Sequence, residues 1–485
     1  MATSYLIAWL LPLLVGCGVC CLLAQPRQRG GLAAMLGSGW LVGVLLAGLA
    51  AQWLARDDTL HAVARVAPWL GGLGALAWLG VWLRWRRHSP IATPAPAPAA
   101  PAWRGLWWLL LALVALRLVL LADEAALRPV FAWDAWSAWA VRPKSWILLG
   151  RADAYVPMID WLAGAPSPAR TMMAWNYPQL LAWIEVWFAS GAGGWNEPLV
   201  NLAWSGALVA FAFAFHGYLR GFGLPAWLAM VLVYVLVSLP LIDAHVALAG
   251  YADLWVALVL GLALLAWARW LLFREPRQWL LAVLLVACLP AIKLEGAIWL
   301  LAFVAVALLE RLPRQWRWVL PGGVVLLLAV ILGADLLGVP LPSVGKVHIG
   351  WGRIDIAGVA SYTLKWHAVG GPMLASLYEL PNWHLLWYLL PALIVWRWRD
   401  VCRSEAARLL GLFVLLQLAA LFVLFFLTSA SAWAEDFTSV NRLILQVVPG
   451  VLVFVAVLLR DPASANEKPV RETDLPGLRK PAARG

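Results

Sequence analysis

The segment "FAWDAWSAWAVRPKSW", residues 131–146, places one carboxylate among tryptophans directly after a strongly apolar run. Asp134 lies between Trp133 and Trp136, and the tryptophans recur every three to four residues, which predicts a helix lying in a membrane interface. A carboxylate beside a bilayer is energetically costly, so we interpret Asp134 as a functional residue, namely a general base. The two tryptophans are expected to contact lipid and substrate. The alternative is an interfacial helix in which Asp134 is only solvated.

Four basic residues are candidates for binding a phosphate. Arg142 and Lys144 follow Asp134 on the same segment, Lys293 occupies a short turn between two apolar runs, and Arg442 begins the last apolar run. The planar fork of arginine and the point charge of lysine both suit phosphate oxygens. The alternatives are contact with lipid headgroups for the first two and pairing with nearby acids for the other two.

Further polar residues stand where apolar runs begin. Tyr177 precedes Pro178 at the start of a short run, and "HVALAGYADLW" places His245 and Asp253 near the start of a longer one. We interpret Asp253 as a second catalytic carboxylate, although an acid in the first turn of a helix also complements the helix dipole. Tyr177, His245 and Glu295 are expected to contact the substrate, and Glu295 can equally pair with Lys293.

The composition predicts an all-α polytopic membrane protein. Of the 485 residues, 64% are hydrophobic and only 13% are charged, whereas soluble domains have about 25% charged residues. The net charge of +11 is distributed over short basic runs at the ends of apolar segments. That distribution is typical of cytoplasmic loops and excludes a continuous nucleic-acid-binding surface.

Apolar runs of about 20 residues predict about 13 transmembrane helices, 317–338 among them, plus a re-entrant or interfacial helix at 177–190. Placing the basic runs in the cytoplasm puts nearly all the candidate residues on the external face. The predicted organisation is a three-span N-terminal preamble (1–83), a Pro/Ala-rich linker (84–103), a transmembrane catalytic region (104–460) with long external loops at 123–176 and 339–382, and a disordered cytoplasmic tail (461–485).

The sequence contains no motif for a metal or a nucleotide cofactor. The five cysteines lie within or at the ends of apolar segments, and the histidines lack metal-ligand spacing. A divalent metal is compatible with the sequence, but no tight carboxylate cluster supports one. A reaction that needs no cofactor is therefore expected.

Asp134, Tyr177-Pro178, "GYADLW", "IKLEG" and "NRLILQVVP" occur in an order that resembles the GT-C class of integral membrane glycosyltransferases, over roughly residues 104–460. This class includes protein mannosyltransferases and aminoarabinose transferases. The resemblance implies that a sugar moves, with inversion, from a polyprenyl-phosphate-linked donor to a glycan, lipid or protein acceptor at the outer surface. Asp134 would be the base, with Asp123 as the alternative. The Ala-, Leu-, Arg- and Trp-rich composition suggests a bacterial inner membrane and undecaprenyl phosphate.

Two other functions fit the same pattern. A transporter or flippase of a lipid-linked sugar would also need a basic, aromatic-lined cavity, although no internal repeat is evident in the sequence. An O-antigen ligase or polymerase would perform related chemistry and would also use a long external loop.

Overall fold

The computed structural model describes residues 2–23, 30–87, 101–312, 338–341, 345–350, 353–356, 360–363 and 365–460. Most of the predicted linker, nearly all of the predicted span at 317–338, parts of the loop at 339–382 and the predicted tail at 461–485 lie outside these residues.

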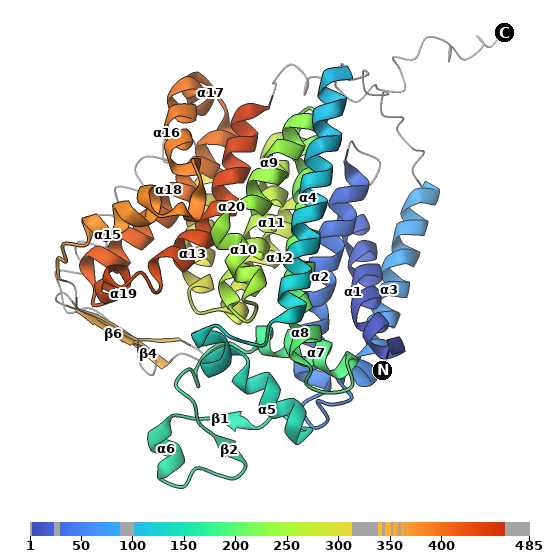
Figure 1. Ribbon diagram of the computed structural model, residues 1–485, viewed down its shortest axis with the longest axis vertical. Helices are drawn as coiled ribbons and strands as arrows, with labels where there is room; N and C mark the ends of the chain where they lie inside the picture. Colours follow the sequence, from blue (N-terminus) through green and yellow to red (C-terminus); the bar gives the residue numbers. More distant parts are fainter. Residues whose placement is uncertain are drawn as a thin grey trace, which may run out of the picture.

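Long apolar helices dominate the described part of the chain (Figure 1). Eight of them are long and apolar enough to cross a membrane, and the count becomes nine if the bent pair α9–α10 forms one span. These helices support the prediction of an all-α polytopic membrane protein. The described residues account for eight or nine of the about 13 spans that the sequence predicts. The eight helices are α1 (Ala2–Leu23), α2 (Gly31–Leu54), α3 (Ala62–Arg87), α4 (Pro101–Leu127), α8 (Glu197–Gly221), α11 (Ala252–Phe273), α18 (Glu405–Leu427) and α20 (Val440–Leu459).

Shorter helices complete the bundle. The region predicted to be re-entrant forms α7, whose twelve residues are all buried. Twelve residues rise only about 18 Å, too little to cross a hydrocarbon core about 30 Å thick. The shorter helices of the bundle are α7 (Leu180–Gly191), α9 (Ala226–Ser238), α10 (Pro240–Ala247), α12 (Pro276–Ile292), α13 (Gly296–Arg311), α16 (Leu386–Trp396) and α17 (Trp398–Arg403).

The segment between α4 and α7 gathers at one end of the bundle, which we call the loop face (the lower end in Figure 1). The predicted interfacial helix forms as a π-helical turn, η1, followed by α5. The elements of this segment are η1 (Ala135–Trp139), α5 (Val141–Leu149), β1 (Ala154–Tyr155), α6 (Met158–Leu162) and β2 (Ala169–Arg170), with β1 and β2 parallel.

The region after α13 contains a four-stranded antiparallel sheet that the sequence did not predict. It occupies part of the expected external loop at 339–382. The sheet and the short elements that follow are β3 (Gly338–Leu341), β4 (Gly345–Gly350), β5 (Arg353–Ile356), β6 (Ala360–Thr363), α15 (Gly370–Leu374), η2 (Ala375–Glu379), η3 (Pro381–Trp383) and α19 (Ser431–Glu435).

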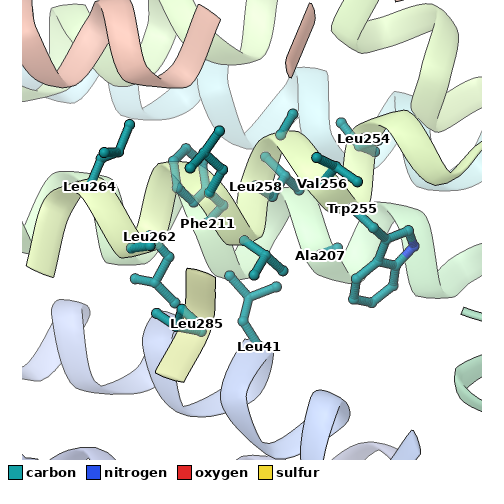
Figure 2. Close-up of a cluster of buried hydrophobic side chains, with 14 of the residues drawn as sticks. Leu41, Ala207, Phe211, Leu254, Trp255, Val256, Leu258, Leu262, Leu264 and Leu285 are labelled. Atoms are coloured by element: carbon teal, nitrogen blue, oxygen red, sulfur yellow. The ribbon is translucent and has the colours of Figure 1, made fainter. Parts of the chain in front are cut away.

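Helix α11 lies at the centre of the hydrophobic core, packed against α8, α12, α18 and α20. Figure 2 shows leucines of α11, Leu258 and Leu262 among them, in one buried cluster with Phe211 and Ala207 of α8, Leu41 of α2 and Leu285 of α12. Trp255 near the start of α11 is fully buried in the same cluster. The core therefore fixes the position of the first turn of α11, which carries Asp253.

Small residues bring the N-terminal helices into the same bundle. A Cβ atom added at Gly217 of α8 would lie 2.2 Å from the backbone nitrogen of Ala34 in α2, and one at Gly43 of α2 would lie 1.8 Å from the carbonyl oxygen of Pro12 in α1. Such close helix packing depends on glycine, as is common between membrane helices. Helix α3 in turn packs against α1, α2 and α7, so the three N-terminal helices belong to the same bundle as the rest of the described chain.

The loop between α2 and α3 also supports the loop face. Thr59 donates a hydrogen bond from its hydroxyl to the Trp146 carbonyl at 2.6 Å and from its backbone N–H to the Gly150 carbonyl at 3.1 Å. The N–H of Ala152 donates to the Arg56 carbonyl at 2.8 Å. These bonds connect the N-terminal helices to α5, the helix that follows η1.

We expect Gly217→Leu to destabilise the protein, because its side chain would separate α2 from α8. Overpacking of this kind costs about 1–3 kcal/mol. Thermal unfolding in detergent, followed by tryptophan fluorescence, measures the effect. Gly72→Leu is the matched control, since a Cβ atom there meets nothing within 4 Å; an equal loss in both variants would contradict the close contact.

Asp153, the residue before β1, forms two ion pairs, one with the nearby Arg151 and one with Arg170 of β2. Its buried carboxylate accepts hydrogen bonds from Arg151 Nε and Arg170 Nε, each at 2.9 Å. Burial alone would raise the pKa of Asp153, but the hydrogen bonds and charges of the two arginines hold it below its ordinary value. Since the folded pKa is depressed, this carboxylate stabilises the fold above its unfolded pKa of about 4. The stabilisation is lost as the pH falls through the depressed value.

Asp153→Asn should therefore lower the melting temperature most at neutral pH. The difference from wild type should shrink as the pH falls from about 7 to about 3. Thermal unfolding across this range tests the expectation. Asp160→Asn, at an exposed site in the same segment, should show no such trend, and a pH-independent effect of Asp153→Asn would argue against the ionic contribution.

Candidate functional site

Charged residues from four separate elements meet at the loop face. Asp134 comes from the residue before η1, Asp253 from the first turn of α11, Lys293 from the turn between α12 and α13, and Arg442 from the first turn of α20. We call these four residues together with Glu295 and Gln446 the polar cluster. Ion pairs and a hydrogen bond join Asp253, Lys293, Glu295 and Gln446 into one group, and an ion pair joins Asp134 to Arg442.

Asp253 is the most deeply buried member, with no exposed surface. Its Oδ1 atom accepts a hydrogen bond from Lys293 Nζ at 2.8 Å and another from Gln446 Nε2 at 2.7 Å. The Gln446 amide is itself oriented by Trp299, whose indole N–H donates to Gln446 Oε1 at 2.6 Å. A buried carboxylate needs such compensation, because desolvating an unpaired charge costs several kcal/mol.

Lys293 connects two carboxylates, since its ammonium group also lies 3.1 Å from Glu295 Oε1. Burial alone would lower the pKa of Lys293, but Asp253 and Glu295 hold it above its ordinary value. The lysine is therefore a cation in the folded protein.

Arg442 forms an ion pair with Asp134, which joins residues 308 positions apart in the chain. Its guanidinium group is held from other sides as well. Nε donates to the Thr438 carbonyl and Nη2 to Ser439 Oγ, both at 2.9 Å, and the group lies 5.1 Å from the centre of the Tyr251 ring. This cation is thus fixed in orientation, with a carboxylate as one of its partners.

A glycine allows η1 to reach this position. Gly250 has φ +113°, and a Cβ atom there would lie 2.5 Å from the Cβ of Ala135. A positive φ is freely adopted only by glycine. The close contact places the start of η1, and with it Asp134, beside the Gly250–Tyr251 loop that leads into α11.

Tyr177 also lies at the cluster, where it interacts electrostatically with Glu295, Lys293 and Asp134. Its ring packs 4.9 Å from that of Trp139. Burial, followed by the charge of Glu295, raises the pKa of Tyr177 above its ordinary value. The hydroxyl therefore stays protonated near neutral pH and can donate a hydrogen bond.

The other two proposed phosphate ligands have different partners. Arg142 is buried and donates to the carbonyl oxygens of Trp175 at 2.7 Å and of Tyr177 at 2.8 Å. It thus positions the segment that carries Tyr177. Lys144 forms an ion pair with Glu197 at 2.8 Å.

The tryptophans beside Asp134 are turned outward. Trp133 is 65% exposed and packs edge-on against the half-exposed Trp136, with ring centres 4.8 Å apart. His245 is buried instead, with its ring 5.2 Å from that of Tyr251. Of the predicted substrate contacts, Tyr177, His245 and Glu295 therefore lie at the cluster, while the two tryptophans lie at the surface.

Sequence reasoning missed Gln446, Trp299 and Tyr251. The sequence does contain a signal that could have identified Gln446. This residue lies four positions after Arg442 within an otherwise apolar run, and polar residues in membrane helices face the protein interior. Trp299 carried no such signal among the 35 tryptophans of the chain.

The cluster can bind an anion and accept a proton. Three carboxylates (Asp134, Asp253, Glu295) and two cations (Lys293, Arg442) give a formal charge of −1, so an incoming phosphate competes with the carboxylates for the cations. Arg442 is the accessible cation, since its side chain is 17% exposed against 9% for Lys293. Within the described ranges, no three His, Cys, Asp or Glu side chains are grouped so as to hold a metal ion.

No family model, curated protein or solved structure matches this chain.

Lys293→Gln should strongly destabilise the protein, because it leaves the buried carboxylate of Asp253 without its cation. Removing one partner of a buried pair costs about 3–5 kcal/mol. Adding Asp253→Asn should recover part of this loss, as measured by thermal unfolding in detergent. Lys144→Gln, which removes an exposed cation, is the control and should cost at most about 1 kcal/mol. A double variant less stable than Lys293→Gln alone would contradict the role of the buried charge.

Proposed function

We propose that the protein is a membrane glycosyltransferase that moves a sugar from a polyprenyl-phosphate-linked donor to an acceptor at the loop face. The observation that carries the proposal is the Asp134–Arg442 ion pair, in which a potential base and a phosphate-binding cation are already in contact. The ordered motifs that resemble the GT-C class are consistent with it. The reaction requires no cofactor.

The donor phosphate would exchange places with Asp134. In the absence of substrate, Arg442 neutralises Asp134. A phosphate binding to the guanidinium group would release this carboxylate and make it available as a base at the moment the donor is bound. Lys293 and Arg442 would then stabilise the negative charge that grows on the leaving phosphate.

The transfer itself would be a single displacement. The acceptor oxygen or nitrogen forms a bond to the anomeric carbon while the bond from that carbon to the phosphate oxygen breaks. The electron pair leaves with the phosphate, and the proton of the acceptor passes to Asp134. This step inverts the anomeric centre, and general base catalysis contributes about 10²–10⁴-fold to such a reaction.

A lipid-linked donor is supported by a groove along the bundle. A cavity of about 980 Å³ lies between α4, α9, α16 and α20, with mostly leucine and valine walls. It shares Arg117 and Leu120 with a second, more polar cavity of about 450 Å³ that reaches Arg128 and Leu248. An apolar groove with a polar end suits an amphiphile. Leu248 is three residues before Tyr251, so the polar end adjoins the segment that enters the cluster.

A second candidate function is transport of a lipid-linked sugar. Helices α9 and α10 bend by 58° at their junction. Interrupted helices with polar residues beside the break are common in transporters, and His245 lies in the second half of this pair. The two functions differ in their need for Asp134, because a transporter requires no base.

Asp134→Asn should lower sugar transfer about 10²–10⁴-fold while donor binding stays equal or becomes tighter, since the variant removes the carboxylate that competes for Arg442. Transfer is measured in membranes supplied with a panel of radiolabelled polyprenyl-phosphate sugars, and binding by the quenching of tryptophan fluorescence with undecaprenyl phosphate. Asp123→Asn, at an exposed site near the end of α4, is the matched control and tests the alternative base.

Full activity of Asp134→Asn would exclude this residue as the base. Loss of activity in Asp123→Asn alone would assign the role to Asp123. If no donor in the panel supports transfer by wild type while the labelled lipid crosses the membrane, transport becomes the better proposal.

A further inference from the structure

Several buried atoms in and around the polar cluster have no hydrogen-bond partner among the described residues. Two of them, Oδ2 of Asp253 and Nε2 of His245, belong to neighbouring side chains. Asp253 has no exposed surface and His245 is 4% exposed. An unsatisfied buried polar atom is costly, so two of them at one site require a physical reason.

Both atoms are hydrogen-bond acceptors. The two hydrogen bonds that Asp253 receives go to its Oδ1, which leaves Oδ2 with free lone pairs. The His245 Nδ1 atom lies 2.8 Å from the carbonyl oxygen of Leu241. Because a carbonyl oxygen can only accept, Nδ1 carries the proton, and Nε2 of the neutral ring is then an acceptor as well.

The two side chains are neighbours without being bonded to each other. The ring of His245 packs 5.2 Å from that of Tyr251, which lies two residues before Asp253, yet among the described residues no hydrogen bond or ion pair joins His245 to Asp253. Two acceptors cannot satisfy each other in any case. Lys293 is already bonded to two carboxylates, and Arg442 to Asp134. The atoms can be satisfied by a group that brings its own N–H or O–H donors.

We propose that Asp253 Oδ2 and His245 Nε2 form a recognition site for a hydrogen-bond donor on the transferred sugar, either a hydroxyl or an amino group. A phosphate is excluded as the occupant, because an ionised phosphate presents only acceptors. The inference rests on the proposed function and extends it. The cations of the cluster bind the phosphate of the donor, and the buried acceptors select the sugar attached to it.

This arrangement predicts strong selectivity. A site built to hydrogen-bond a substrate hydroxyl rejects the analogue that lacks it far more strongly than an apolar pocket rejects a missing methylene group, because the buried partner is left unpaired. His245 would thus act on the choice of sugar, and its removal should affect selectivity more than the binding of the lipid phosphate.

The first experiment compares binding of a polyprenyl-phosphate sugar with binding of the bare polyprenyl phosphate. The sugar should tighten binding to wild type about tenfold or more, which corresponds to about 1.4 kcal/mol. His245→Phe keeps an aromatic ring against Tyr251 but removes the acceptor. In this variant the affinity for the polyprenyl-phosphate sugar should exceed that for the bare polyprenyl phosphate by about twofold at most, while the affinity for the bare lipid stays as in wild type.

His216→Phe is the matched control. His216 also has a buried Nε2 atom without a hydrogen-bond partner among the described residues, but it lies in the last two turns of α8, near Arg220 and away from the polar cluster. It should retain the full gain from the sugar. His245→Leu serves as a second variant if the phenylalanine is not accommodated, and folding is checked by thermal unfolding. An undiminished gain from the sugar in both folded His245 variants would overturn the proposal.

The second experiment identifies the donor group. Analogues of the sugar are tested in which single hydroxyl or amino groups are replaced by hydrogen. One replacement should lower binding to wild type about tenfold and have no further effect in His245→Phe. If no replacement weakens binding to wild type, the buried acceptors are satisfied by water alone and the proposal is wrong. Because these tests measure binding, they are informative even if wild type transfers no sugar and the proposed function fails.

Discussion

The buried charge of Asp253 is the interaction on which the rest of the site depends. This carboxylate begins α11, the helix at the centre of the core, and it has no contact with solvent. A buried charge persists only when it is compensated. The compensating groups come from the α12–α13 turn (Lys293) and from α20 (Gln446). One carboxylate therefore fixes three elements relative to each other, and Trp299 fixes the amide that completes the set.

The ion pair between Asp134 and Arg442 extends this arrangement from the buried carboxylate toward the surface. Arg442 lies one helical turn before Gln446, so the same face of α20 contacts Asp253 on the inside and Asp134 on the outside. Asp134 reaches this position because Gly250 lets η1 pack against the loop before α11. A phosphate that binds at Arg442 would thus release Asp134. The ion pair between Asp253 and Lys293 would meanwhile keep α11 and the α12–α13 turn in place.

Much of the candidate site could be predicted from the sequence. Placing a charge beside an apolar run costs free energy, so such residues are few and easily recognised. Asp134, Asp253, Lys293 and Arg442 were identified on that ground. The same reasoning selected Arg142, which instead donates to backbone carbonyls and positions the segment that carries Tyr177. Nothing local distinguishes such an arginine from a ligand-binding one, since its partner comes from a segment that packs against it only in the folded chain.

The sequence by itself determined that the protein is helical, that it is built for a membrane, and that many of its charges lie near the ends of apolar segments. Hydropathy is a property of neighbouring residues, so these features are local. Only the tertiary structure decided which charges pair, where the apolar groove runs, and how the N-terminal helices support the loop face through Thr59. Asp134 and Arg442 are 308 positions apart, and a contact of that range forms only when the packing of the bundle brings η1 and α20 together.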